Sequence, residues 1–202
     1  MVAIVDYGVG NLFSLECSFK RVGAETIVTS DPELIKKADR IMLPGVGAFE
    51  DAAKKLKASG LDMLLKAEAK SGKPFMGICL GMQMMFERSF EYGCHEGLGL
   101  LKGDIVPMKG YVDDGLKIPQ IGWNQLKFVK DSPLFKYCKD GDCVYFVHSY
   151  FASNCEESVI ATTEYGKPVT AAVAQGNIVG CQFHPEKSGE VGLNIFRAFC
   201  EM

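Results

Sequence analysis

Short apolar runs alternate with amphipathic stretches over the first half of the chain. The runs have the length of buried strands, and apolar residues at helical spacing follow each of them. Strands are predicted at residues 2–5, 25–29, 40–43 and 74–78. Helices are predicted from residue 12, from the Ser-Asp-Pro-Glu start at residue 30, and over 49–57 and 61–70. This alternation predicts an α/β fold whose mainly parallel, open twisted sheet is flanked by helices.

The second half of the chain has a different pattern. Between residues 93 and 133, glycine-rich turns separate short β segments at 102–108 and 125–129, and no long helix is predicted. Further strands are predicted at 143–148, 159–163, 169–174 and 178–183, and a final helix at 191–199. A Gln-Gly-Asn turn at 175–177 joins the last two strands as a hairpin. We therefore expect an added antiparallel β section within a single domain spanning residues 1–202.

The segment 77–83, GICLGMQ, follows the fourth predicted strand. Cys79 has a glycine two residues away on either side, which is the pattern of a nucleophile elbow with sulfur in place of oxygen. Glycine suits such a tight turn because it has no Cβ. At the start of the next helix, free N–H groups favour the thiolate, and the N–H of Leu80 is a candidate oxyanion donor. The alternative is that Cys79 is one buried structural cysteine among eight.

The segment 182–186, QFHPE, supplies a candidate base. Its two-residue spacing places His184 and Glu186 on one side of an extended chain, so that the carboxylate can orient the imidazole. The alternative is an exposed turn with a surface carboxylate. His148 is the rival base, but it has no carboxylate close by in sequence and is expected to be a packed or substrate-adjacent histidine.

The loop 44–47, PGVG, ends the third predicted strand. Its glycines let backbone N–H groups approach a substrate closely, so the loop is a candidate source of a second oxyanion donor. The plain alternative is a strand-to-helix turn. Because the ligand crevice of a parallel sheet lies outside the carboxyl ends of its strands, this loop and Cys79 are expected at the same edge.

Composition and charge exclude several classes of function. The formal net charge is −3 and no run of lysine or arginine occurs, so nucleic acid is not an expected partner. No apolar run approaches the roughly 20 residues of a membrane helix, and the first residues lack the features of a signal peptide. We expect a cytoplasmic protein that does not bind a membrane.

No cofactor or metal site is expected. The eight cysteines contain no Cys-x-x-Cys pair and the three histidines are dispersed, so neither a disulfide framework nor a metal cluster is indicated. The Cys94-His95-Glu96 run lacks a second ligand pair. The glycines at 8 and 10 suggest a dinucleotide site, but position 13, where the third glycine of that motif belongs, is Phe13.

Three of these motifs together, at 44–47, 77–83 and 183–186, resemble the triad (class I) glutamine amidotransferases, and the resemblance spans the whole chain. Further stretches are similar to the glutaminase subunits of imidazole glycerol phosphate synthase, an enzyme of the histidine pathway. These stretches are DYGVGNL at 6–12, PGVGAF at 44–49, IGWN at 121–124, YFVHSY at 145–150 and HPEKS at 184–188.

The resemblance implies hydrolysis of glutamine to glutamate and ammonia through a cysteine thioester. It assigns Cys79 as the nucleophile, His184 as the group that moves the proton, and Glu186 as the group that orients His184. It further implies that the N–H groups of Leu80 and Val46 form the oxyanion hole, after a peptide of the 44–47 strand has reoriented. The residues implied to hold the amino acid end of glutamine are Gly45, Gly47, Gln83 and the main chain at Ser149 and Tyr150.

The resemblance also implies a heterodimer with a (β/α)8 barrel cyclase that receives the ammonia through a channel. That cyclase makes imidazole glycerol phosphate and an aminoimidazole carboxamide ribotide. Residues matching the docking face of the family are Asn11, Trp123, Tyr145 and Lys187. The sole tryptophan also suits an interface anchor on physical grounds, the alternative being a partly buried core residue.

Three other functions are considered beside this one. A paralogous pair of this type with the same glutaminase chemistry can serve a surface-sugar pathway. A stand-alone cysteine hydrolase or peptidase can use a related elbow. A non-enzymatic scaffold would carry a broken triad or lack a glycine at the elbow, and neither is seen in the sequence.

Overall fold

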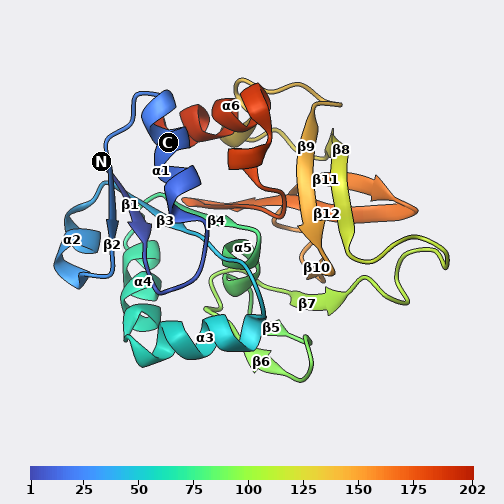
Figure 1. The fold of residues 1–202 in the computed structure, drawn as a ribbon, viewed down its shortest axis with the longest axis horizontal. Coiled ribbons are helices and arrows are strands. Elements are labelled where there is room, and N and C mark those ends of the chain that lie inside the picture. The colour runs from blue at the N-terminus through green and yellow to red at the C-terminus, as the bar shows by residue number, and fades with distance from the viewer.

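A nine-stranded sheet runs through the computed structural model, which describes residues 1–202 (Figure 1). Its strands are ordered β2-β1-β3-β4-β13-β12-β11-β8-β9. Their bounds are β1 Val2–Val5, β2 Thr26–Thr29, β3 Arg40–Leu43, β4 Phe75–Ile78, β8 Gln120–Phe128, β9 Cys143–His148, β11 Val159–Tyr165, β12 Lys167–Gln175 and β13 Ile178–Cys181.

The sheet has a parallel half and an antiparallel half. From β2 to β13 every neighbouring pair is parallel. From β13 to β9 every neighbouring pair is antiparallel, beginning with the hairpin of β12 and β13 that the turn at 175–177 predicts. The predicted parallel sheet with an added antiparallel section is therefore confirmed.

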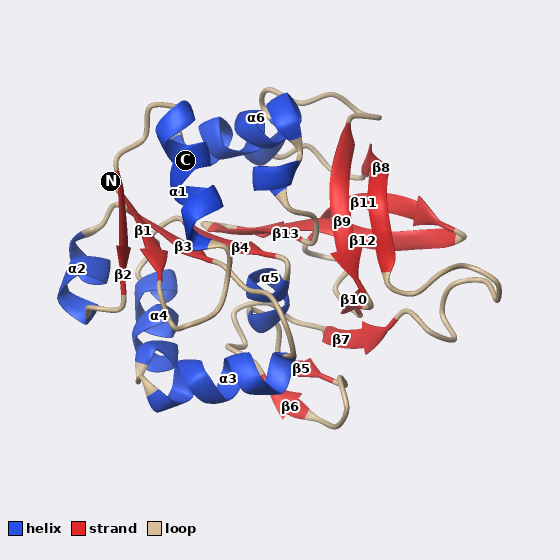
Figure 2. Ribbon diagram, in the orientation of Figure 1, coloured by secondary structure: helices blue, strands red, loops and turns tan.

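Helices cover both faces of the parallel half (Figure 2). Helices α1 and α6 lie on one face, and α3, α4 and α5 lie on the other. The helix bounds are α1 Leu12–Arg21, α2 Pro32–Lys37, α3 Phe49–Ala58, α4 Leu61–Lys70, α5 Leu80–Met84 and α6 Gly189–Cys200, with short 3-10 turns at Pro133–Phe135 and Pro185–Lys187. Every helix is either too short or too polar to cross a membrane.

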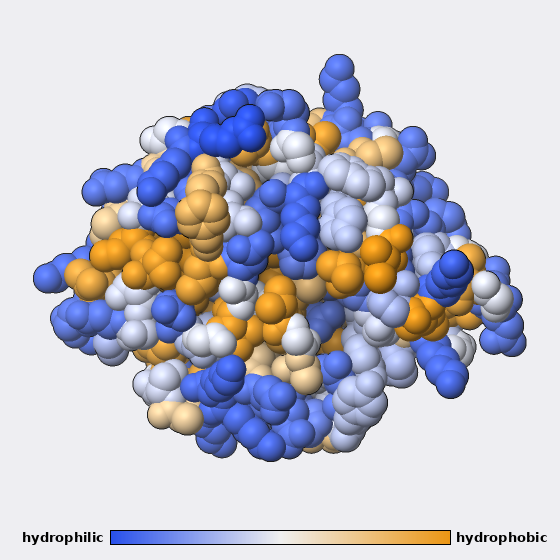
Figure 3. Space-filling view, in the orientation of Figure 1, coloured by the Kyte–Doolittle hydropathy of each residue, from blue (hydrophilic) through white to orange (hydrophobic).

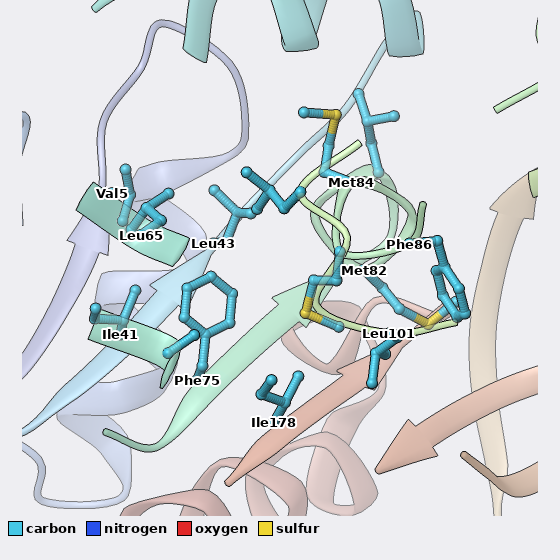
Figure 4. Packing of buried hydrophobic residues seen from close by; sticks show 14 of the residues in the cluster. Val5, Ile41, Leu43, Leu65, Phe75, Met82, Met84, Phe86, Leu101 and Ile178 are labelled. Carbon is cyan, nitrogen blue, oxygen red and sulfur yellow. The ribbon is translucent and has the colours of Figure 1, made fainter. Parts of the chain in front are cut away.

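Alternate residues of each parallel strand enter different cores, which explains why these strands are apolar throughout. In β1, Val2 and Ile4 pack with residues of α1 and α6. Their neighbours Ala3 and Val5 pack with residues of α3 and α4 in the other core. Figure 4 shows this second core, where Phe75 of β4 lies among side chains from β3, α4 and α5.

A second, four-stranded sheet of order β10-β7-β5-β6 lies beside the large one. Its strands are β5 Arg88–Ser89, β6 His95–Glu96, β7 Asp104–Pro107 and β10 Tyr150–Ser153. Only β7 was expected from the sequence, as part of 102–108. The two-residue strands β5 and β6 carry no periodicity, since pairing with β7 and with each other defines them.

Several predicted strand boundaries are wrong by one or two residues, among them those of the strands expected at 102–108, 159–163 and 169–174. Two further differences are explained by contacts with neighbouring segments. The strand expected at 125–129 begins at Gln120, because the segment 120–125 pairs with β9 and places Trp123 opposite Tyr145. The strand expected at 178–183 ends at Cys181, because the chain leaves β4 there and the N–H of His184 donates to the carbonyl of Tyr145.

Candidate active site

Three neighbouring strand ends bring the sequence motifs together. Strands β3, β4 and β13 are parallel neighbours, with Leu43 beside Gly77 and Cys181 beside Ile78. The N–H of Cys79 donates to the carbonyl of Cys181 at 2.7 Å. The loop 44–47, Cys79 and the segment 182–186 therefore meet at the carboxyl edge of the sheet, as expected.

The turn at Cys79 has the geometry of a nucleophile elbow. Cys79 has φ 54° and ψ −114°, a conformation that a residue with a side chain rarely adopts. A Cβ at Gly81 would collide with the carbonyl oxygen of Leu43, and one at Gly77 would lie 2.7 Å from the backbone N of Met82. A Cβ at Gly45 would lie 2.5 Å from the backbone N of Gly81. The glycines thus allow the loop 44–47 to pack directly on the elbow.

His184 and Glu186 form a buried pair beside the thiol. His184 Nδ1 lies 2.7 Å from Glu186 Oε1, and both side chains are 3% exposed. Burial lowers the pKa of His184, but hydrogen bonds to Cys79 and Glu186 and the charges on both raise it overall to about 10. The arrangement therefore offers a candidate nucleophile, a charged imidazole next to it and a carboxylate that fixes the ring.

His148 is buried and neutral. Its Nδ1 lies 2.9 Å from the carbonyl oxygen of Tyr150, which can only accept, so this nitrogen carries the proton. Its Nε2 lies 3.0 Å from the atom placed as Gln120 Oε1; with the proton on Nδ1 this nitrogen can only accept, so the neutral ring requires the Gln120 amide to turn its NH2 group toward it. Burial, opposed by the bond to Tyr150 and assisted by the charge of His184, lowers the pKa of His148 to about 4. Because both ring nitrogens are engaged, His148 is a packed histidine of the cavity wall rather than a base.

A cavity of about 670 Å³ opens in front of Cys79. This volume suits a small molecule. The residues expected from the sequence that line it are Val46, Gly47, Cys79, Leu80, Gln83, Ser149, Tyr150 and His184. Gly45 and Glu186 lie outside the lining, the first buried against the elbow and the second bonded to His184.

The cavity also contains charged groups that sequence analysis missed. Glu91 and Lys109 are its two charged wall residues other than histidine. One carboxylate oxygen of Glu91 accepts from the N–H of Phe49 at 2.6 Å, which fixes the side chain at the start of α3. No motif marks either residue, because both reach the cavity through the small sheet and its loops, whose positions depend on tertiary contacts.

Gln182 is another residue near Cys79 that sequence analysis did not identify. It is fully buried, and its Nε2 lies 3.8 Å from the Sγ of Cys79. The sequence contained a signal, since Gln182 precedes His184 by two residues and thus faces the same side of an extended chain.

Three of the four residues expected at a docking face gather in one cluster. The rings of Trp123 and Tyr145 meet edge to face with centroids 6.0 Å apart, and Lys187 Nζ lies 5.5 Å from the centroid of Tyr145. Trp123 is 56% exposed, which excludes the alternative of a core tryptophan. Asn11 instead caps α1, its side chain accepting from the N–H of Ser14, and no hydrogen bond joins it to the cluster.

Apolar side chains are exposed elsewhere as well. On the face drawn in Figure 3, apolar patches form a broken band across the middle, at the level of the sheet in Figure 1. Large apolar residues that are more than half exposed include Phe13 at 74%, Met63 at 68% and Ile121 at 61%. Ile121 is two residues from Trp123 on β8, so the Trp123 region presents more than one apolar anchor.

The chain is similar to known proteins over its whole length. The family described as glutamine amidotransferase class-I matches residues 3–201. The imidazole glycerol phosphate synthase subunit HisH of Lactococcus lactis subsp. lactis is 48% identical over 201 residues, covering 99% of this chain and 98% of that protein. The subunit of the same name from Wolinella succinogenes is 47% identical over 204 residues, covering 100% of both chains.

Solved structures share the fold. A crystal structure of a glutamine amidotransferase gives a TM-score of 0.78 at 19% identity and covers 100% of this chain and 98% of that one. The structure of PurLQS from Thermotoga maritima gives a TM-score of 0.73 at 21% identity, covering 99% of this chain and 97% of that one. These matches place the α/β sheet and its helices in a common architecture.

Proposed function

The chain belongs to the class I glutamine amidotransferases and, within them, to the family of imidazole glycerol phosphate synthase subunits HisH, and on that premise we propose that Cys79 is its nucleophile. It is an enzyme of histidine biosynthesis that hydrolyses glutamine to glutamate and ammonia. The surface-sugar alternative is not favoured, because the full-length relatives carry the histidine-pathway name. The observation that carries the assignment of residues is that Cys79 and His184 stand together at the cavity wall, with Glu186 bonded to His184 from outside the lining.

The reaction follows from the charges of these three residues. The sulfur of Cys79 attacks the carboxamide carbon of glutamine, and His184 gives its proton to the nitrogen as the C–N bond breaks and ammonia leaves. Water then adds to the thioester carbon and passes a proton to His184, and the C–S bond breaks to release glutamate. Glu186 keeps the ring oriented and stabilises its positive charge, having no hydrogen-bond partner other than His184.

Two backbone N–H groups are proposed to hold the negative oxygen of the tetrahedral intermediates. The N–H of Leu80 stands at the start of α5, where helical N–H groups have no partner within the helix. Val46 lies on the cavity wall, in the loop that packs on the elbow through Gly45. Each such donor contributes about 2.7–4 kcal/mol to lowering the barrier.

The amino acid end of glutamine carries one positive and one negative charge, and apart from His184 the cavity offers one acidic and one basic side chain. The Glu91 carboxylate suits the ammonium group, and Lys109 suits the carboxylate. Gln83 also lines the cavity, and its Oε1 makes no hydrogen bond within the chain. The remaining contacts are assigned to Gly45, Gly47 and the main chain at Ser149 and Tyr150.

The ammonia is used by a cyclase subunit with which the chain forms a heterodimer. Free ammonia in neutral water is mostly protonated and cannot attack as a nucleophile, so the cavity must pass it on without release. We assign a (β/α)8 barrel to the partner, and place its docking face at Asn11 and at the cluster of Trp123, Tyr145 and Lys187. The eight unpaired cysteines suit the reducing cytoplasm, where we place the enzyme.

Glutamate release by the purified chain tests these assignments. It is measured alone, with the cyclase subunit, and with the cyclase and its ribulosyl nucleotide substrate. Strong release only in the full mixture is expected, and Cys79→Ala should abolish it while synthesis from added ammonium salt continues in the same complex. Release by Cys79→Ala at the unchanged rate would show that another residue is the nucleophile.

A further inference from the structure

Two buried glutamine side chains connect the substrate cavity to the sulfur of Cys79. Gln83 Nε2 lies 3.0 Å from the carbonyl oxygen of Tyr150 and 3.0 Å from Gln182 Oε1. Gln182 Nε2 in turn lies 3.8 Å from Cys79 Sγ. Gln182 is 0% exposed and Gln83 is 6% exposed, so water does not compete for these contacts.

The network fixes which atom of Gln182 faces the sulfur. A backbone carbonyl can only accept, so the amide nitrogen of Gln83 must point at Tyr150. The same nitrogen is the neighbour of Gln182, and it donates its second N–H to the Gln182 oxygen. The nitrogen of Gln182 is left facing Cys79, and it can only donate.

We propose that Gln182 is a further residue of the reaction centre, whose N–H holds the sulfur of Cys79 as a thiolate. This inference rests on the proposed role of Cys79. A donor bonds more strongly to a charged acceptor than to a neutral one, so the contact favours thiolate over thiol. His184 supplies the first donor to this sulfur, and Gln182 supplies a second that does not titrate.

The second donor acts in both halves of the reaction. In the resting enzyme the Gln182 N–H stabilises the thiolate and holds the sulfur in a fixed position. In thioester hydrolysis water adds to the carbonyl carbon, the C–S bond breaks and its electron pair returns to sulfur, where the Gln182 N–H again stabilises the charge. The amide holds no proton that it must give up, so His184 remains free to move protons.

Alkylation of Cys79 by iodoacetamide as a function of pH tests the proposal on the full chain without glutamine or partner. The tryptic peptide 71–88 contains Cys79 and no other cysteine, so mass spectrometry reads this thiol among the eight. Gln182→Met removes the donor at similar volume. Gln182→Glu keeps an oxygen to accept from Gln83 and replaces only the donor. Thr163→Val is the matched control, because Thr163 is also 0% exposed but its hydroxyl donates to the Gln125 carbonyl, away from the sulfur.

The midpoint of alkylation should rise by about one pH unit in Gln182→Met, the size expected for losing one hydrogen bond to a charged group. It should rise further in Gln182→Glu, where a carboxylate replaces the donor, and should stay in place in Thr163→Val. An unchanged midpoint in both Gln182 variants, or an equal rise in the control, would overturn the proposal. Because this readout needs no turnover, it is separate from the test of glutaminase function.

Discussion

His148 should make the free energy of unfolding fall at acid pH, and replacing this histidine should remove that part of the pH dependence. Its pKa in the folded chain is lowered to about 4, against 6.5 for an unfolded histidine. Between these values the unfolded chain takes up a proton that the folded chain refuses, so stability is complete above about pH 6.5 and falls as the pH drops toward 4. The two pKa values differ by roughly 2.5, and each pKa unit corresponds to about 1.4 kcal/mol, so the free energy of unfolding should fall by about 3 kcal/mol between pH 6.5 and pH 4.

His148→Gln removes the titrating group and keeps an amide that can donate to the carbonyl of Tyr150. We expect this variant to be less stable than the wild type at pH 7. Its further loss of stability between pH 7 and pH 4 should, however, be smaller by about 3 kcal/mol. Urea unfolding at a series of pH values, followed by far-ultraviolet circular dichroism, measures both quantities.

The control for this comparison is a variant that loses a buried polar group but no titratable group. Thr163→Val serves here too, since its stability should run parallel to that of the wild type at every pH. Parallel curves for wild type and His148→Gln between pH 7 and pH 4 would refute the reasoning, because His148 would then protonate equally in the folded and unfolded chains.

Three further predictions concern the elbow, the triad and the docking cluster. Gly81→Ala should lower the free energy of unfolding by about 3 kcal/mol, because its Cβ meets the Leu43 carbonyl, and unchanged urea unfolding would contradict this. Glu186→Gln should move the pKa of His184 down from about 10, because the charge beside the imidazole is lost, and a nuclear magnetic resonance titration that still ends near 10 would argue against the pairing. Lys187→Ala should weaken docking and so uncouple glutamate release from synthesis in the complex, and equal yields of glutamate and product would remove Lys187 from the docking face.

The helices and strands that could be predicted are those whose own pattern of apolar and polar residues shows which side is buried. The helix at 61–70 and the strands at 2–5 and 40–43 match the structure, because one apolar stripe or a continuous apolar run is enough to define them. Strands β5 and β6 could not be predicted, since two-residue strands exist only through their partners.

The same distinction applies to the site. Cys79, His184 and Glu186 stand in motifs whose local geometry already suggests their chemistry. Glu91 reaches the cavity from a loop that only the small sheet positions. The direction of the Gln182 amide depends on a residue of α5 and a carbonyl of β10, which the chain brings together from three distant segments.

The backbone of Cys79 sets a conflict between durability and activity. A residue with a side chain in such a conformation costs about 1–3 kcal/mol, a cost that glycine would not carry. Cys79→Gly is the substitution that best relieves the backbone strain of this turn, and it also removes the nucleophile. Laboratory selection for heat resistance alone would drift toward an inert protein, so any stabilised descendant must also be selected for turnover.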